Sequence, residues 1–140
     1  MKMNNNSKFT KKKIVNFIKI IFHIANILLL VFYLFPGSIL GCLLYNDCKI
    51  QPQLTSDFIV SSNHVYAFLL LSSLGLISYF NSLKIIILYL ILISIILELL
   101  HLFIPNRSFQ FSDLFGNIIG VLITVFILIL FNYWRKNGFI

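Results

Sequence analysis

Four apolar stretches, each close to the length needed to cross a lipid bilayer, restrict what this chain can fold into. They cover residues 14–35, 63–80, 85–104 and 114–134. A helix needs about 20 apolar residues to span the hydrocarbon core, and only 11% of all residues here are charged. A soluble domain of this composition would leave apolar surface in water. We therefore expect an all-α, polytopic membrane protein, a bundle of four transmembrane helices.

The distribution of positive charge predicts the orientation of these spans. A formal net charge of +7 would suggest nucleic acid if the charges formed a patch on a soluble domain. With four spans, however, eight basic residues fall on the side of the termini and two on the other side. Because Lys and Arg are in excess on the cytoplasmic side, we expect both termini in the cytoplasm and no nucleic-acid partner. The eight are Lys2, Lys8, Lys11, Lys12, Lys13, Lys84, Arg135 and Lys136, and the two are Lys49 and Arg107.

The chain divides into a basic cytoplasmic tail over residues 1–13, expected to be disordered, and a transmembrane domain over residues 14–136. A basic start before an apolar run also resembles a signal peptide. Ile39-Leu40-Gly41-Cys42 even loosely resembles a lipobox. Cleavage there would leave only three spans, so we favour a membrane anchor.

The longest loop, residues 36–62, is expected on the outer side and contains two cysteines. Cys42 and Cys48 either close a small disulfide in an oxidising compartment or are unrelated small apolar residues. Their spacing is not that of a metal site, because no second cysteine pair or histidine cluster accompanies them. The sequence predicts no metal and no cofactor.

Polar side chains interrupt the apolar pattern where the third and fourth spans meet. Glu98 and His101 lie one helical turn apart, and Asp113 and Asn117 lie one turn apart on the next helix. Arg107 lies in the turn between the two helices. An acid inside an apolar helix is costly and is usually functional. The sequence therefore predicts a polar site at the outer face.

Each of these residues also has a purely structural interpretation. Glu98 could pair with Arg107 only to lock the turn, and a buried pair need not stabilise more than an apolar contact does. Asp113 could cap the fourth helix, where an acid suits the helix dipole. Gly116 and Gly120 are spaced as a close-packing face between membrane helices. His64, at the outer start of the second span, could simply begin that helix.

Taken together, these residues form a pattern that resembles the VanZ-like membrane protein family. The matching residues run from about His64 to Leu122 and are His64 with Ala67-Phe68, Glu98-x-x-His101, Pro105-x-Arg107, Asp113-x-x-x-Asn117 and Gly120. The chain departs from the family in having His101 where Gln is usual, and Val60-Ser61 where the family tends to have Asp-Lys. The resemblance implies a bacterial inner (plasma) membrane protein and a link to resistance against the glycopeptide teicoplanin. It does not imply a particular reaction.

Our first hypothesis is an outer-facing site that binds or processes a lipid-linked or cell-envelope substrate. Arg107, Asn117 and His64 would bind the substrate, since a guanidinium suits phosphate and carboxylate groups. Glu98, His101 and Asp113 would act as acid and base; whether the protein is an enzyme stays open.

The alternative hypothesis is a non-enzymatic accessory or structural membrane protein, whose polar cluster fixes helix packing. A small multidrug-type transporter is disfavoured because the first span has no acid. In either case membrane lipids are the expected partners.

Overall fold

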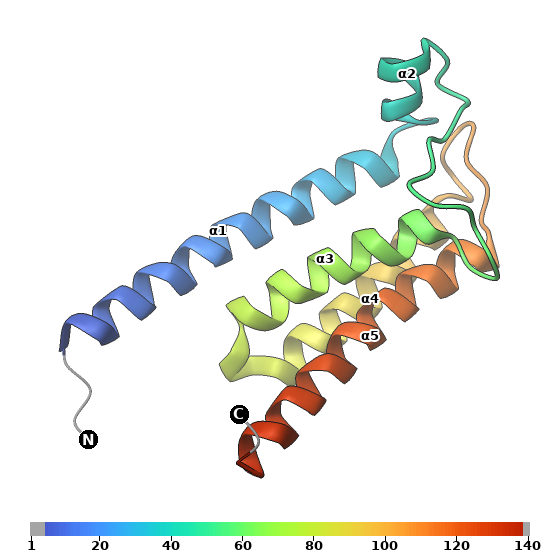
Figure 1. Cartoon of the computed structure of the whole chain (residues 1–140). Coiled ribbons are helices and arrows are strands. Elements are labelled where there is room, and N and C mark those ends of the chain that lie inside the picture. The colour runs from blue at the N-terminus through green and yellow to red at the C-terminus, as the bar shows by residue number, and fades with distance from the viewer. Residues whose placement is uncertain (1–4, 139–140) are drawn as a thin grey trace.

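The computed structural model describes residues 5–138, with side chains from residue 9 onward, and within that range all regular structure is helical. Figure 1 shows the helices in chain order. The start of α1 and the end of α5 lie at one end of the bundle, and the two long loops lie at the other. The elements are α1 (Asn5–Leu34), α2 (Ile39–Tyr45), α3 (Ser62–Ser78), the 3-10 turn η1 (Phe80–Ser82), α4 (Leu83–Leu100) and α5 (Phe111–Lys136).

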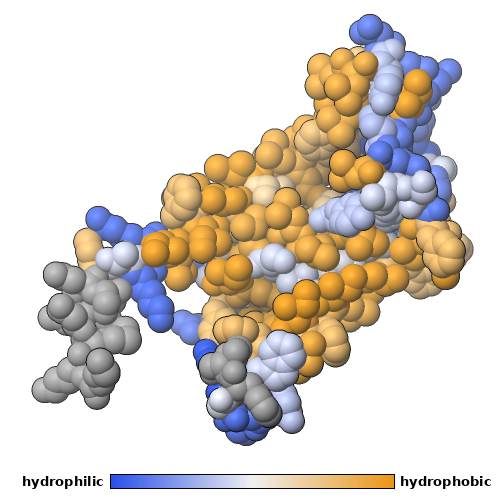
Figure 2. Space-filling model, viewed as in Figure 1, coloured by the Kyte–Doolittle hydropathy of each residue, from blue (hydrophilic) through white to orange (hydrophobic). Residues whose placement is uncertain are grey.

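Three of these helical segments are long and apolar enough to cross a membrane: Phe9–Leu34, Phe80–Leu100 and Phe111–Lys136. The fourth apolar helix, α3, has 17 residues, about 26 Å at 1.5 Å per residue. That is slightly less than the roughly 30 Å of hydrocarbon in a bilayer. The expected all-helical membrane architecture is confirmed, whereas a count of four spans stays a prediction. Figure 2 shows apolar surface along the helices and polar residues gathered toward the ends.

The closest packing in the bundle is between α3 and α5, and two glycines of α5 allow it. A Cβ added to Gly120 would lie 2.5 Å from the carbonyl oxygen of Val65, and one added to Gly116 would lie 2.8 Å from that of Ser61. Backbones can approach this closely only where side chains are absent. The predicted packing face is therefore confirmed, and it places the first turns of α3 and α5 side by side.

The structure corrects the sequence-based boundaries at three places. Residues 5–13 are the first turns of α1 and are helical, so the expectation of a disordered segment there is wrong. The outer loop contains a short helix, α2, and a disulfide between Cys42 and Cys48, which decides between the two interpretations of those cysteines. Finally, α4 ends at Leu100 and not near residue 104, so Glu98 lies within the last turn and not deep in the helix.

Candidate functional site

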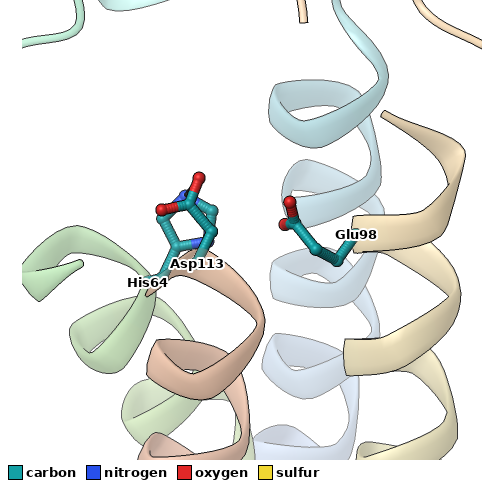
Figure 3. A group of neighbouring side chains, drawn as sticks. All are labelled: His64, Glu98 and Asp113. Atoms are coloured by element: carbon teal, nitrogen blue, oxygen red, sulfur yellow. Dashed lines mark ion pairs between the residues drawn. The ribbon is translucent and has the colours of Figure 1, made fainter. Parts of the chain in front are cut away.

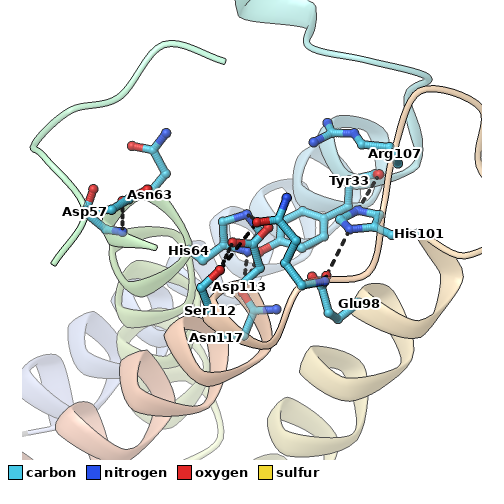
Figure 4. A network of polar contacts seen from close by, with 12 residues as sticks. Tyr33, Asp57, Asn63, His64, Glu98, His101, Arg107, Ser112, Asp113 and Asn117 are labelled. Atoms are coloured by element: carbon cyan, nitrogen blue, oxygen red, sulfur yellow. Dashed lines mark hydrogen bonds and ion pairs between the residues drawn. The ribbon is translucent and has the colours of Figure 1, made fainter. Parts of the chain in front are cut away.

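The predicted site residues gather at the loop end of the bundle and come from α3, α4, α5 and the turn after α4 (Figure 4). His64 comes from the first turn of α3, Glu98 from the last turn of α4, and Asp113 from the first turn of α5. Asn117 lies one turn further along α5, and Tyr33, which the sequence did not indicate, comes from the end of α1. Four helices therefore converge on a single polar cluster. Its most deeply buried members are Glu98, His101 and Asn117, each exposed by 2% or less.

Hydrogen bonds among Tyr33, His64 and Asn117 orient the histidine ring. The hydroxyl of Tyr33 donates to Oδ1 of Asn117 at 2.6 Å, and Nδ1 of His64 lies 2.9 Å from that hydroxyl and 3.0 Å from the same Oδ1. Nδ2 of Asn117 donates to the carbonyl oxygen of Ser94 at 3.4 Å, which fixes the orientation of the amide. Because Oδ1 only accepts and the hydroxyl hydrogen is already used, Nδ1 of His64 carries the hydrogen. If the ring is neutral, Nε2 presents a lone pair.

That lone pair faces a carboxylate. Nε2 of His64 lies 3.4 Å from Oδ2 of Asp113, and both side chains are largely buried. The other carboxylate oxygen of Asp113, Oδ1, accepts from the hydroxyl of Ser112 at 3.2 Å. Two acceptors at this distance repel each other unless a positive charge lies between them. The pair therefore requires either a proton on Nε2 or a bound cation.

Glu98 and His101 form a second pair, on the α4 side of the cluster. Oε1 of Glu98 accepts from the backbone N–H of Gln110 at 2.9 Å and lies 3.4 Å from Nδ1 of His101. Nε2 of His101 is 3.1 Å from the carbonyl oxygen of Tyr33. Both ring nitrogens thus face oxygen acceptors, which hold the ring between Glu98 and the backbone of α1. The ring of Tyr33 stacks on it with a centroid separation of 5.6 Å and 18° between the planes.

Arg107 is attached to α1 and not to an acid. Its Nη2 donates to the carbonyl oxygen of Phe32 at 3.1 Å, and its Nε to that of Phe35 at 3.4 Å. These carbonyls lie in the last turn of α1 and just after it, where no further helical N–H is available. Burial lowers the pKa of Arg107, and the negative charges of Asp113 and Glu98 oppose that shift. The structural interpretation in which Glu98 pairs directly with Arg107 is wrong.

A cavity of about 480 Å³ opens beside the cluster, between α1, α3 and the outer loop. Polar groups of Tyr33, His64, His101 and Arg107 line one part of it. The rest of the lining is largely apolar and includes side chains from α1, α2 and α3. Ligand pockets commonly combine apolar walls with a few polar groups that fix orientation.

Three side chains of the cluster could also hold a metal ion (Figure 3). The donor atoms of His64, Glu98 and Asp113 all lie within 4.8 Å of one another. The sequence predicted no metal here, because the three residues come from three different helices and form no recognisable spacing. The sequence assigned all three to one polar site, and the structure adds that their donor atoms are close enough to share one ion.

The sequence model of a family described as VanZ/LLP1 matches residues 2–132. The chain belongs to the VanZ/LLP1 family. This match confirms the resemblance and extends it, because the expected likeness began only at His64. No curated protein and no solved structure matches the chain.

With α1 inside the VanZ/LLP1 match, Tyr33 becomes part of the family's domain and not of an added anchor. The one sequence signal for Tyr33 was its polar hydroxyl, which lies near the end of an otherwise apolar span. Asp57, by contrast, lies apart from the cluster and accepts from the backbone N–H of Ser62 at 2.7 Å. It caps the start of α3 and so helps to position His64.

Proposed function

We propose that this VanZ/LLP1 protein binds the anionic head group of a lipid-linked or other cell-envelope substrate at the outer face of a bacterial inner membrane. The observation that carries the proposal is the cavity beside the cluster, which joins apolar walls to Arg107, His64 and His101. Such a lining suits an amphiphile, with a chain against the apolar part and a charged group against the polar part. Membrane lipids and envelope precursors are molecules of that kind.

Arg107 is the group best suited to the charged end of such a substrate. Its hydrogen bonds to α1 use Nε and Nη2, so among the described contacts the hydrogens of Nη1 are available to a ligand. Guanidinium groups are favoured for phosphate and carboxylate because their donors match two acceptor oxygens at once. The same bonds to α1 hold the guanidinium in position before the ligand arrives.

The proposed topology has four spans, with both termini in the cytoplasm and the cluster outside. It is supported by the eight-to-two distribution of basic residues and by the position of the start of α1 and the end of α5 at the bundle end opposite the cluster (Figure 1). The disulfide in the outer loop fits an oxidising compartment. Substrate would then enter from the outer leaflet, near α2.

Processing of the bound substrate is a further part of the proposal. Glu98, His101 and Asp113 supply acidic and basic groups at or next to the cavity, as general acid–base catalysis requires. Nε2 of His64 lies 3.4 Å from Oδ2 of Asp113, so a proton could pass between the two side chains.

The alternative function, an accessory protein whose cluster only fixes helix packing, is favoured by one observation. Arg107, Tyr33 and Asn117 all make bonds between helices or between a loop and a helix. In that case, changes in the cluster would affect folding and would leave ligand binding untouched.

Binding of a polyprenyl phosphate, compared with the polyprenol of the same length, tests the two functions. We expect the purified full chain to bind the phosphate more tightly, and Arg107→Gln to remove that difference. The matched control is Lys49→Gln, which removes the other outer basic residue and should leave the preference unchanged. Equal binding of both lipids by the unaltered protein would contradict head-group recognition and favour the accessory function.

A further inference from the structure

We propose that His64, Glu98 and Asp113 bind one divalent transition-metal ion, with Zn²⁺ as the ion that fits best. The three donors are one imidazole nitrogen and two carboxylate oxygens, one from each of α3, α4 and α5. Zn²⁺ accepts this mixture of ligands, whereas Mg²⁺ prefers six oxygens in an octahedron. The site goes beyond the proposed head-group binding and does not depend on it.

The spacing of His64 and Asp113 already fits such an ion. Their atoms Nε2 and Oδ2 are 3.4 Å apart. Two ligands at 2.0–2.1 Å from a tetrahedral zinc ion are about 3.4 Å apart. The third donor, from Glu98, lies within 4.8 Å of the other two, so it has to move inward by at most about 1.4 Å to reach the same separation.

The hydrogen-bond pattern independently calls for a cation at this point. Nδ1 of His64 carries a hydrogen, held by Tyr33 and Asn117, so in the neutral ring Nε2 directs a lone pair at a carboxylate oxygen. A metal ion placed between the two atoms would turn this repulsion into two bonds. The competing explanation is a proton on Nε2, and the experiment below separates the two.

Glu98 gives the second observation that points to a ligand. Its side chain is fully buried, and its Oε2 has no hydrogen-bond partner among the residues that the structure describes. A buried carboxylate oxygen without a partner is costly. Figure 3 shows this carboxylate on the side of α4 that faces His64 and Asp113. A metal ion in that space would satisfy the oxygen.

The neighbours of the three ligands are arranged as metal sites require. Each ligand is held by a further contact: His64 by Asn117, Asp113 by Ser112, and Glu98 by the backbone of Gln110. Such contacts orient the ligands and raise their affinity for the ion. With three protein ligands, a fourth position stays open for water or a substrate oxygen, as in catalytic and not structural zinc sites.

The basic side chains near the three proposed ligands, His101 and Arg107, do not occupy the position of the metal ion. His101 approaches the other oxygen of Glu98, Oε1, and donates to the backbone of Tyr33. Arg107 is bonded to carbonyls of α1. Neither forms a described hydrogen bond or ion pair with Asp113 or with Oε2 of Glu98, so these carboxylate oxygens remain available to a divalent ion.

Metal binding to the full chain in detergent, purified with a histidine-free tag and stripped by chelator, tests the proposal. We expect one Zn²⁺ per chain by calorimetry, and visible absorption bands of tetrahedral Co²⁺ when cobalt replaces zinc. Asp113→Asn and Glu98→Gln should each weaken zinc binding at least about 100-fold, since even residues behind the ligands contribute 10- to 100-fold. Asp113 is partly exposed, and therefore its variant is expected to fold even if that of Glu98 does not.

Two control variants are taken from outside the cluster. His23→Gln changes a histidine that pairs with Tyr79 near the opposite end of the bundle, and Asp47→Asn changes an outer-loop acid. Both should bind zinc as the unaltered protein does. No saturable zinc binding by the unaltered chain, or equal binding by Asp113→Asn, would overturn the metal site and leave the proton on His64 as the explanation. If the unaltered protein binds zinc but does not prefer polyprenyl phosphate over polyprenol, only the proposed function is contradicted.

Discussion

The guanidinium of Arg107 donates to the carbonyl oxygen of Phe32 at 3.1 Å, and so fastens the turn after α4 to the end of α1. Glu98, which the sequence suggested as its partner, instead accepts from the backbone N–H of Gln110. The two charged residues therefore act at different places. If the two residues formed an ion pair, exchanging their charges would keep the attraction; because they do not, the exchange should keep neither set of contacts.

Reversing the charges, with Glu98→Arg and Arg107→Glu together, should not restore stability. A glutamate at position 107 cannot donate to the carbonyls of Phe32 and Phe35, and an arginine at position 98 cannot accept from Gln110. Because neither substitution makes good the hydrogen bonds that the other removes, the double variant should be less stable than either single variant. Thermal unfolding in detergent of both single variants and the double variant measures this. A double variant more stable than either single one would show that the charges are paired after all.

Tyr33→Phe should destabilise the protein by about 1 kcal/mol, because it removes the shortest hydrogen bond to the buried Oδ1 of Asn117. The ring is retained, so stacking on His101 stays. The matched control is Tyr66→Phe, whose exposed hydroxyl contacts Thr55 at 3.2 Å. That change should cost less than about 0.5 kcal/mol. Equal effects in unfolding experiments would mean that the Tyr33 hydroxyl has no special role.

Gly120→Ala should weaken the packing of α3 against α5 more than Gly75→Ala affects the bundle. The new Cβ at position 120 would lie 2.5 Å from the backbone oxygen of Val65, and only a backbone shift can relieve that contact. At position 75 the nearest atom, at 3.0 Å, belongs to the side chain of Phe22, which can move. Overpacking costs about 1–3 kcal/mol. Unfolding temperatures of the two variants provide the comparison, and a greater loss for Gly75→Ala would contradict this account.

The polar residues of α4 and α5 in the cluster were predictable from the sequence because they break an apolar pattern, whereas Tyr33 was not. Glu98, Asp113 and Asn117 stand out in helices that are otherwise hydrophobic, and helical spacing places them near one bundle end. Their partners were not predictable in the same way. The bond from Arg107 to α1 and the approach of Tyr33 to His64 depend on how the first helix packs, and no periodicity in the sequence states that.

The fold was predictable to the level of helices but not of their ends. Hydropathy locates apolar segments, yet α1 extends back to Asn5 through a lysine-rich segment that hydropathy excludes. In the same way, α4 ends at Leu100, although the apolar run continues beyond it. The short helix α2 is stabilised by a Ser38 cap and lies beside a disulfide, both local features that apolar pattern does not reveal.

The disulfide predicts how the outer loop responds to thiol reagents. Cys42 and Cys48 should both resist labelling in untreated membranes and should both be labelled after reduction. Changing both to Ser should loosen the loop around α2 while leaving the helical bundle folded, because the bond closes a segment outside the α3–α5 core. Labelling without reductant, at the rate seen after reduction, would show that the bridge does not form in the cell.

The number of spans can be decided from the location of the C-terminus. If α3 crosses the membrane, four crossings return the chain to the side on which it began, and a reporter fused after Lys136 should be cytoplasmic. If the 17-residue α3 stays outside, only three helices cross and the same reporter should be periplasmic.

Single cysteines at Ser82 and Asn106, in a background of Cys42→Ser and Cys48→Ser, give an independent measurement. With four spans an impermeant reagent added outside should label position 106 and not position 82, because those positions lie at opposite ends of α4. Labelling at position 82 alone would place the polar cluster on the cytoplasmic side and would contradict a substrate that arrives from the outer leaflet.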